Sequence, residues 1–255
     1  MILAIDAGNT NIVIGCIDKE RCHFIERLST VRVKTELEYA IDIKSILDIY
    51  HIHPDEIEGG IISSVVPQIT TNIKLAAEKI LKKEILVIGS GIKTGLDIRI
   101  DDPGQLGADL VVDSVAGIAN YPLPLMIFDM GTANTVCVID GQKRYLGGMI
   151  YPGLGVSLDS LTAHASQLGG ISLEPPVRVI GRNTIDCMKS GVIYSAAAAM
   201  DGIIDRIEEE MGEKMTVVAT GGLAKRIVPH CRREVILDDD LLLKGLLILY
   251  DKNKR

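Results

Sequence analysis

The sequence contains no tryptophan and only 2 phenylalanines, and aromatic residues make up 4% of its 255 residues. Its core must therefore be built mainly from aliphatic side chains. Apolar residues reach 47% and charged residues 24%, which is close to the average soluble protein and excludes a disordered chain. The length is sufficient for one large domain or for two of ordinary size.

Positive charge is also scarce. Lysine and arginine number 27 against 34 acidic residues, which gives a net charge of −7, and no basic stripe stands out. Nucleic acids and anionic membranes attract proteins through clustered positive charge, so we expect neither as a partner. No stretch approaches the roughly 18 uninterrupted apolar residues of a membrane span. The first apolar run stops at Asp6 with no basic residues before it, unlike a signal peptide.

Paired cysteines are missing as well. The five cysteines are odd in number, scattered, and form no Cys-x-x-Cys pair: Cys16, Cys22, Cys137, Cys187 and Cys231. This usage favours reduced thiols in a cytoplasmic protein. The five histidines show no metal-ligand spacing, and we expect them to have surface or packing roles.

What the sequence does contain is an internal repeat. Residues 2–18 read ILAIDAGNTNIVIGCID, and residues 125–140 read LMIFDMGTANTVCVID. Each copy is an apolar strand that ends in aspartate, a glycine-containing polar turn, and a second β-rich run. This pattern predicts a β-hairpin in each half of the chain. Asp6 and Asp129 lie about half the chain apart, which indicates two related lobes.

The remaining pattern alternates between helix and strand, which is typical of an α/β protein. No linker separates the halves, so we expect lobes at residues 1–118 and 119–255. The predicted helices are 36–50, 70–83, 106–120, 183–211 and 240–250, and the predicted strands outside the hairpins are 59–65, 84–88 and 217–220.

The two turns could bind phosphate. Glycine in a turn lets backbone N–H groups converge on an anion, and asparagine and threonine add neutral donors. An aspartate before the turn, such as Asp6, could hold Mg²⁺. An ordinary hairpin explains either turn alone. Because the motif recurs from Asp129 onwards, we favour two turns that grip a polyphosphate from opposite sides of a cleft.

Two further glycine clusters are open to two interpretations. Residues 147–155 hold four glycines and a proline, so we expect an irregular loop before a helix that starts near Ser157. That helix N-terminus could face phosphate, or the loop could be purely structural. Gly221 and Gly222 follow a strand, where they could approach a nucleotide base or ribose or simply form the turn into a helix.

Carboxylates near predicted helix starts are similarly ambiguous. Asp109 follows the small residues Gly107 and Ala108, so a ligand could come close to it. A helix cap is the common role at such a position, and a catalytic base is the alternative. The triple Asp238-Asp239-Asp240 is expected to be a solvated cap of the last helix.

Taken in order, these motifs resemble type III pantothenate kinases, which belong to the superfamily of actin, sugar kinases and heat-shock chaperone ATPases. The resemblance runs almost end to end. It is carried by Asp6-x-Gly8-Asn9-Thr10, Gly107-Ala108-Asp109, Asp129-x-Gly131-Thr132-Ala133, Gly147-Gly148-x-Ile150-x-Pro152-Gly153, Asn183-Thr184, Met188-x-Ser190-Gly191, Thr220-Gly221-Gly222 and Leu243-Lys244-Gly245-Leu246.

The resemblance implies two ribonuclease H-like (actin-like ATPase) lobes around a nucleotide cleft and ATP-dependent phosphorylation of pantothenate, the first step towards coenzyme A. It implies that Asp109 is the general base and that a homodimer shares its active sites. The ATP contacts would come from Asp6, Ala7, Gly8, Asn9, Thr10, Asn11, Ile12, Val13 and Thr132, joined by Gly221 and Gly222. Pantothenate would contact Gly107, Ala108, Asp109, Leu110 and Thr184. Asp129 would bind a monovalent cation, K⁺ or ammonium.

Two positions depart from the family pattern. Leu110 stands where the family usually has arginine, and Ile100 stands where it commonly has tyrosine. Both changes fall on the acceptor side, and the phosphate motifs are intact. Two alternatives therefore remain beside a pantothenate kinase. One is a non-catalytic nucleotide-binding paralogue or regulator, and the other is a kinase of another small hydroxyl substrate.

Overall fold

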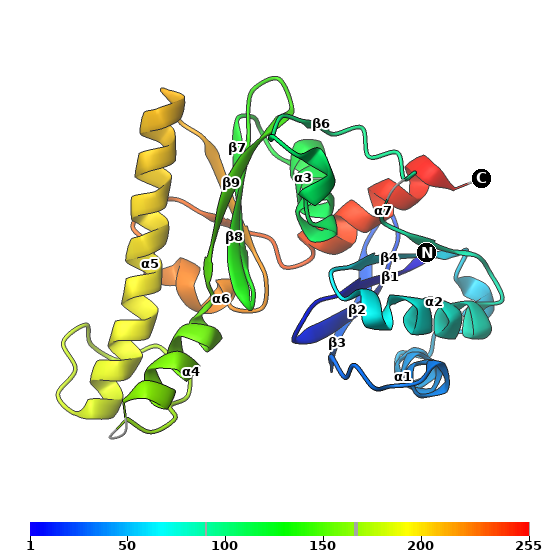
Figure 1. Ribbon diagram of the computed structural model, residues 1–255, viewed down its shortest axis with the longest axis horizontal. Coiled ribbons are helices and arrows are strands. Elements are labelled where there is room, and N and C mark those ends of the chain that lie inside the picture. Colours follow the sequence, from blue (N-terminus) through cyan, green and yellow to red (C-terminus); the bar gives the residue numbers. More distant parts are fainter. Residues whose placement is uncertain (90, 166–167, 255) are drawn as a thin grey trace. The chain divides into compact units, whose positions relative to one another are not determined.

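A computed structural model describes residues 1–89, 91–165 and 168–254. The chain forms two compact units (Figure 1). Unit 1 comprises Met1–Leu96, Asp101–Ala119 and Asp240–Arg255, and unit 2 comprises Asp97–Ile100 and Asn120–Asp239. This division differs from the expected lobes 1–118 and 119–255, because the C-terminal helix packs on the sheet of unit 1.

Unit 1 is built on a five-stranded sheet in the order β3-β2-β1-β4-β5. The strands are β1 (Ile2–Ala7), β2 (Asn11–Ile17), β3 (Cys22–Ser29), β4 (Gly60–Ser64) and β5 (Ile85–Val87). The first three pair antiparallel, whereas β4 runs parallel to β1 and β5 parallel to β4. Buried residues follow one another along β1, as expected for a strand that is covered on both faces.

Helices cover both faces of this sheet. On one face lie α1 (Glu36–Ile49) and α2 (Pro67–Leu81), and on the other α7 (Leu241–Asn253) packs with Val112 and Val115 of α3 (Ala108–Asn120), as Figure 1 shows for α1, α2 and α7. Thr35 starts α1 with a complete capping box to Glu38. The short 3-10 helices η1 (Pro54–Glu56) and η2 (Pro103–Gln105) complete the unit.

Unit 2 is built on a six-stranded sheet in the order β11-β10-β7-β8-β9-β6. Its strands are β6 (Asp97–Ile98), β7 (Leu125–Met130), β8 (Ala133–Ile139), β9 (Arg144–Pro152), β10 (Thr216–Thr220) and β11 (Ile236–Leu237). Strands β7, β8 and β9 are antiparallel, and β10 runs parallel to β7.

The long helix α5 (Thr184–Met211) covers one face of this sheet (Figure 1). Asn183 caps its start, and Gly212 ends it in the left-handed conformation. Ile193, Ala197, Met200 and Ile204 recur at helical spacing and pack on Met126, Phe128 and Val217. The other helices are α4 (Leu154–His164), α6 (Ala224–Ile227) and the 3-10 helix η3 (Val228–His230).

The internal repeat is confirmed in detail. Strands β1 and β7 have the same order of burial, four buried residues followed by the half-buried Asp6 or Asp129 and one more buried residue. Strands β2 and β8 also share one burial pattern. Asp6 pairs with Val13 and Asp129 with Thr135, so the second turn is one residue shorter, as the sequences indicate.

Two expectations from the sequence are wrong. The glycine cluster at 147–155 is not an irregular loop, because β9 continues to Pro152 and α4 begins at Leu154. Its glycines allow close packing, since a Cβ on Gly148 would overlap the Val136 carbonyl oxygen. Asp238 is not a solvated cap residue. It is buried and accepts a 2.5 Å hydrogen bond from the Tyr121 hydroxyl.

Candidate active site

The first hairpin turn is an exposed loop with a fixed backbone. The Gly8 N–H donates to the Asn11 carbonyl at 3.0 Å. Thr30, directly after β3, holds the turn, because its hydroxyl donates to the Gly8 carbonyl at 2.6 Å and its N–H to the Thr10 carbonyl at 2.9 Å. Asn9, Thr10 and Asn11 are exposed. These three side chains therefore lie at the surface, on a turn whose shape is already set.

Some of the residues that the family resemblance places at ATP cannot contact a ligand through their side chains. Ala7 and Ile12 are buried in the core of unit 1, so they can contact a ligand only through backbone groups. Asp6 and Val13 are half-buried and paired across β1 and β2. Side chains directly opposite each other in an antiparallel pair lie on the same face, so the Asp6 carboxylate and Val13 share one face of the sheet.

The second turn is held by Gly153, for which the sequence motifs predict no individual role. The Gly153 N–H donates to the Thr132 carbonyl at 3.0 Å, so the start of α4 is fastened to the turn. A Cβ on Gly153 would overlap the Gly131 carbonyl oxygen and lie 2.6 Å from that of Thr132. The signal in the sequence is the glycine after Pro152, but only the fold reveals its neighbour. Thr132 itself is exposed.

Asp129 and Gly221 are brought together in unit 2. Thr220 pairs with Asp129 in the parallel β10–β7 ladder, and Gly221 follows with a φ of +92°. That φ is left-handed and favours glycine. A Cβ on Gly221 would overlap the Asp129 carboxylate oxygen and lie 2.6 Å from the Met130 nitrogen. Gly222 is exposed beside it, between the strand and α6 as expected.

Asp109 lies in the first turn of α3, after Gly107 and Ala108. Burial raises the pKa of its carboxyl, and the hydrogen bond from the Leu110 N–H at 2.9 Å offsets this only in part. A carboxyl held away from solvent with a raised pKa is typical of a proton acceptor, although structural sites also perturb pKa values. The helix-cap and the catalytic interpretations both fit its place in the first turn.

The remaining acceptor-side residues lie in different parts of the chain. Leu110 follows Asp109 in α3 and is half-buried in unit 1. Ile100 belongs to unit 2, where its side chain lies 3.7 Å from the position of a Cβ on Gly147. Thr184 is the exposed first residue of α5, after the Asn183 cap.

The described parts of the chain hold no group of three or more His, Cys, Asp or Glu side chains arranged to bind a metal ion. Cations at Asp6 or Asp129 would therefore need oxygens from backbone, hydroxyl groups or substrate in addition to one carboxylate. In the same residues no helix is long and apolar enough to cross a membrane.

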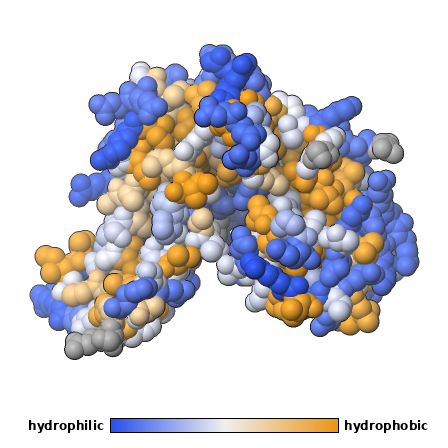
Figure 2. Space-filling model, viewed as in Figure 1, coloured by the Kyte–Doolittle hydropathy of each residue, from blue (hydrophilic) through white to orange (hydrophobic). Residues whose placement is uncertain are grey.

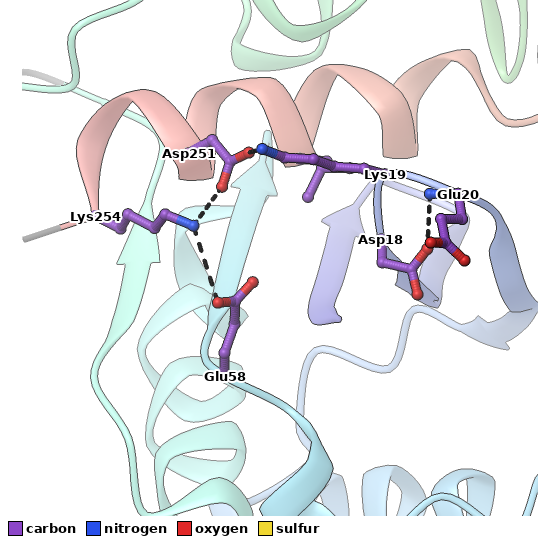
Figure 3. A pocket seen from close by; sticks show the side chains of 7 residues that line it. Asp18, Lys19, Glu20, Glu58, Asp251 and Lys254 are labelled. Atoms are coloured by element: carbon purple, nitrogen blue, oxygen red, sulfur yellow. Dashed lines mark hydrogen bonds and ion pairs between the residues drawn. The ribbon is translucent and has the colours of Figure 1, made fainter.

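Unit 1 also has an open charged pocket of about 350 Å³, which Asp18 at the end of the first repeat lines but the turn residues do not (Figure 3). Its lysines are already paired, because Lys254 lies 2.6 Å from Asp251 and 3.8 Å from Glu58, and Lys19 lies 3.3 Å from Asp251. The motif residues, not this pocket, therefore define the candidate site.

Solved structures share this fold at low sequence identity. A conserved Baf family protein from Campylobacter jejuni matches with a TM-score of 0.59 and 17% identity over 99% of this chain and 98% of that chain. Component A of (R)-2-hydroxyglutaryl-CoA dehydratase from Acidaminococcus fermentans matches with a TM-score of 0.56 and 13% identity over 98% and 96%. These likenesses show an actin-like ATPase fold and nothing more.

Sequence comparison is more specific. The family model described as type III pantothenate kinase matches residues 2–206. A type III pantothenate kinase from an Exiguobacterium species is 44% identical over 100% of both chains. One from Bacillus cytotoxicus is 42% identical over 99% of this chain and 97% of its own. With both duplicated hairpins in place and relatives that match from end to end, the chain belongs to the type III pantothenate kinase family.

Proposed function

We propose that this enzyme transfers the γ-phosphoryl group of ATP to the hydroxyl of pantothenate and forms 4'-phosphopantothenate, the first step of coenzyme A biosynthesis in the cytoplasm. The observation that supports this most directly is the pair of equivalent hairpins, in a chain whose full-length relatives are type III pantothenate kinases. Phosphoryl transfer depends on positioning and charge neutralisation, which two glycine-containing turns are suited to supply.

On the phosphate side, residues 6–13 and Thr132 bind the ATP phosphates. Exposed Asn9, Thr10 and Asn11 offer neutral donors on a turn that Thr30 holds in place. Gly221 and Gly222 bring backbone close to the nucleotide base or ribose. Because the turn is fixed before ATP arrives, little ordering of the protein opposes binding.

On the acceptor side, pantothenate contacts Gly107, Ala108, Asp109, Leu110 and Thr184. The Asp109 carboxylate takes the proton of the reacting hydroxyl. The hydroxyl oxygen forms a bond to the γ-phosphorus, and the bond from that phosphorus to the bridging oxygen of ADP breaks. The raised pKa of Asp109 suits this role, because a more basic carboxylate accepts a proton more readily.

Cations would supply positive charge that the site residues lack. The named site residues include no lysine or arginine, and the whole chain carries a net charge of −7. Asp6 fits a role in holding Mg²⁺, an oxygen-binding ion, near the phosphates. Asp129 fits K⁺ or ammonium, because its carboxylate lies against Gly221 where no Cβ blocks access. When bound, these ions neutralise phosphate charge.

We also propose a homodimer that shares its active sites. Exposed apolar side chains occur around α4 and the start of α5, and Figure 2 shows apolar groups interspersed with polar ones at this end of unit 2. The exposed apolar residues, together called the apolar surface around α4, are Met149, Ile150, Val156, Leu161, Val177, Val179, Ile180 and Ile185. Val177 is 100% and Ile180 82% exposed, and large exposed apolar side chains of this kind support a contact with a second copy. Thr184 begins α5 within this surface, so a second copy would cover it.

The deciding experiment measures 4'-phosphopantothenate by mass spectrometry with ATP, Mg²⁺ and either K⁺ or Na⁺. We expect product only when pantothenate is present and more product with K⁺ than with Na⁺. If the protein binds ATP but forms no phosphopantothenate, the proposed function is wrong.

The alternatives rest on Leu110, which leaves an apolar side chain next to Asp109 in the first turn of α3. An apolar residue there favours a less anionic acceptor than a cation would. The same assay with a panel of small hydroxyl compounds separates the three cases. Turnover of another compound but not of pantothenate indicates a different kinase, and ATP binding without any turnover indicates a non-catalytic paralogue.

A further inference from the structure

The two hairpins differ at one position next to their aspartates. Val13 lies opposite Asp6 in the first hairpin, and Thr135 lies opposite Asp129 in the second. Opposed residues of an antiparallel pair have Cβ atoms about 5 Å apart on the same face. The Thr135 hydroxyl is therefore a neighbour of the Asp129 carboxylate, where the first hairpin has only a hydrocarbon side chain.

The Thr135 hydroxyl is buried, and among the residues that the structure describes it has no hydrogen-bond partner. A buried hydroxyl without a partner is costly, and such groups are rare unless water or an ion completes them. A valine at this position, as in the first hairpin, would avoid the cost. The packing of unit 2 therefore does not explain this hydroxyl. A bound ligand would supply the hydrogen-bond or coordination partner that it lacks among the described residues.

Two further residues lie beside Asp129 on the other side from Thr135. Thr220 pairs with Asp129 from the other side in the β10–β7 ladder and is buried. Gly221 then turns with a left-handed backbone against the Asp129 carboxylate, in space that any Cβ would fill. The equivalent residue in unit 1 is Ser63, which pairs with Asp6 in the β1–β4 ladder. Both hairpins therefore have a hydroxyl residue on this side of their aspartate. Thr135 is therefore the additional oxygen of the second hairpin.

We infer that Thr135 Oγ1 is a ligand of the monovalent cation at Asp129, and that this hydroxyl makes the second hairpin the one that selects K⁺. The inference rests on the proposed cation site at Asp129. Mg²⁺ bound at Asp6 would keep water and phosphate ligands, whereas a monovalent cation at Asp129 would need further oxygens from the protein. Val13, which lies opposite Asp6, has no side-chain oxygen to offer a cation, and this agrees with a Mg²⁺ site completed by water and phosphate.

The test uses the full-length protein and measures its melting temperature as KCl replaces tetramethylammonium chloride at constant ionic strength. A ligand that binds the folded state raises the melting temperature. We expect Thr135→Val to need about tenfold more K⁺ for the half-maximal rise, since one oxygen ligand to a charge is worth about a decade in affinity. The matched control is Ser63→Ala, which removes a buried hydroxyl beside Asp6 and should leave the K⁺ midpoint unchanged.

The inference is overturned if Thr135→Val keeps the wild-type K⁺ midpoint, if Ser63→Ala shifts it equally, or if the wild type shows no K⁺ response. If Thr135→Val does not fold, Thr135→Ser and Thr135→Ala decide the question. Serine should keep the wild-type midpoint and alanine should shift it about tenfold, and equal midpoints would again overturn it. Melting needs no turnover, so loss of pantothenate phosphorylation would contradict the proposed function without changing this result.

Discussion

The Gly153 N–H donates a hydrogen bond to the Thr132 carbonyl at 3.0 Å, and the two backbones lie so close that no side chain fits between them. The contact joins the first turn of α4 to the tip of the second hairpin. The glycine-rich run at the end of β9 thus fixes the position of the turn that we propose binds phosphate.

Replacing Gly153 with alanine should displace this turn. The new Cβ would overlap backbone oxygens that cannot move independently, and overpacking of this kind costs about 1–3 kcal/mol. We expect ATP affinity to fall about tenfold or more in calorimetry. The control is Gly155→Ala, where a Cβ meets nothing within 4 Å and helix propensity improves. Equal ATP affinity in the two variants would contradict the positioning role of Gly153.

Asp109→Asn should lower turnover by about 10²-fold or more, because a general base typically contributes that much. ATP affinity should stay nearly unchanged. In the wild type the rate should fall as the pH drops through the pKa of Asp109, which burial raises above the usual value of about 3.9. The measurement is the pH dependence of kcat/KM, with exposed Asp101→Asn as control. Full activity in Asp109→Asn would exclude it as the base.

The same variant should show that Asp109 is unfavourable for stability. Because its pKa is higher in the folded than in the unfolded protein, ionisation weakens folding as the pH rises through the folded pKa. Asparagine does not ionise, so Asp109→Asn should melt at or above the wild-type temperature at pH 8. This advantage should disappear at acidic pH. A lower melting temperature at pH 8 would indicate a structural role instead.

The apolar surface around α4 predicts a dimer that charge should disrupt. We expect Val177→Asp with Ile180→Asp to give a monomer of about 27.6 kDa in light scattering, while the wild type has twice that mass. The control places aspartate at Leu37 and Ile41, which are also exposed and apolar but lie on α1 in unit 1. A monomeric wild type would contradict the shared active site.

Glu208 should be the main acid-sensitive group of unit 2. Burial alone would raise its pKa, but hydrogen bonds from Lys214, Arg233 and the Met215 N–H outweigh burial and lower the pKa to about 2. Its stabilisation is therefore complete above the ordinary glutamate pKa and is lost as the pH falls towards 2.

Glu208→Gln should accordingly cost about 2 kcal/mol at neutral pH, because the buried carboxylate loses hydrogen bonds from a partly exposed Arg233 and an exposed Lys214. Urea denaturation at pH 7 and pH 3 checks this, and the difference from wild type should shrink at the lower pH. Exposed Glu209→Gln serves as the control. A loss no larger than in that control would show that the ion pairs contribute little.

The sequence by itself determined the duplicated hairpins, the alternation of helix and strand, and the family. These features depend on residues that are close together in the sequence, because the spacing of apolar residues predicts helices and strands and the residues of a turn predict a hairpin. The shorter second turn and the strand-to-helix glycine at Gly221 also followed from local order.

Only the tertiary structure decided which residues meet across the sheets. Burial of Asp238 against Tyr121, the contact of Gly153 with Thr132, and the return of α7 to unit 1 join residues far apart in sequence. The Thr135 hydroxyl beside Asp129 is of the same kind, because only strand register and burial show that it has no hydrogen-bond partner among the described residues. Side chains that look like caps or loops in the sequence acquire their roles from neighbours that only packing supplies.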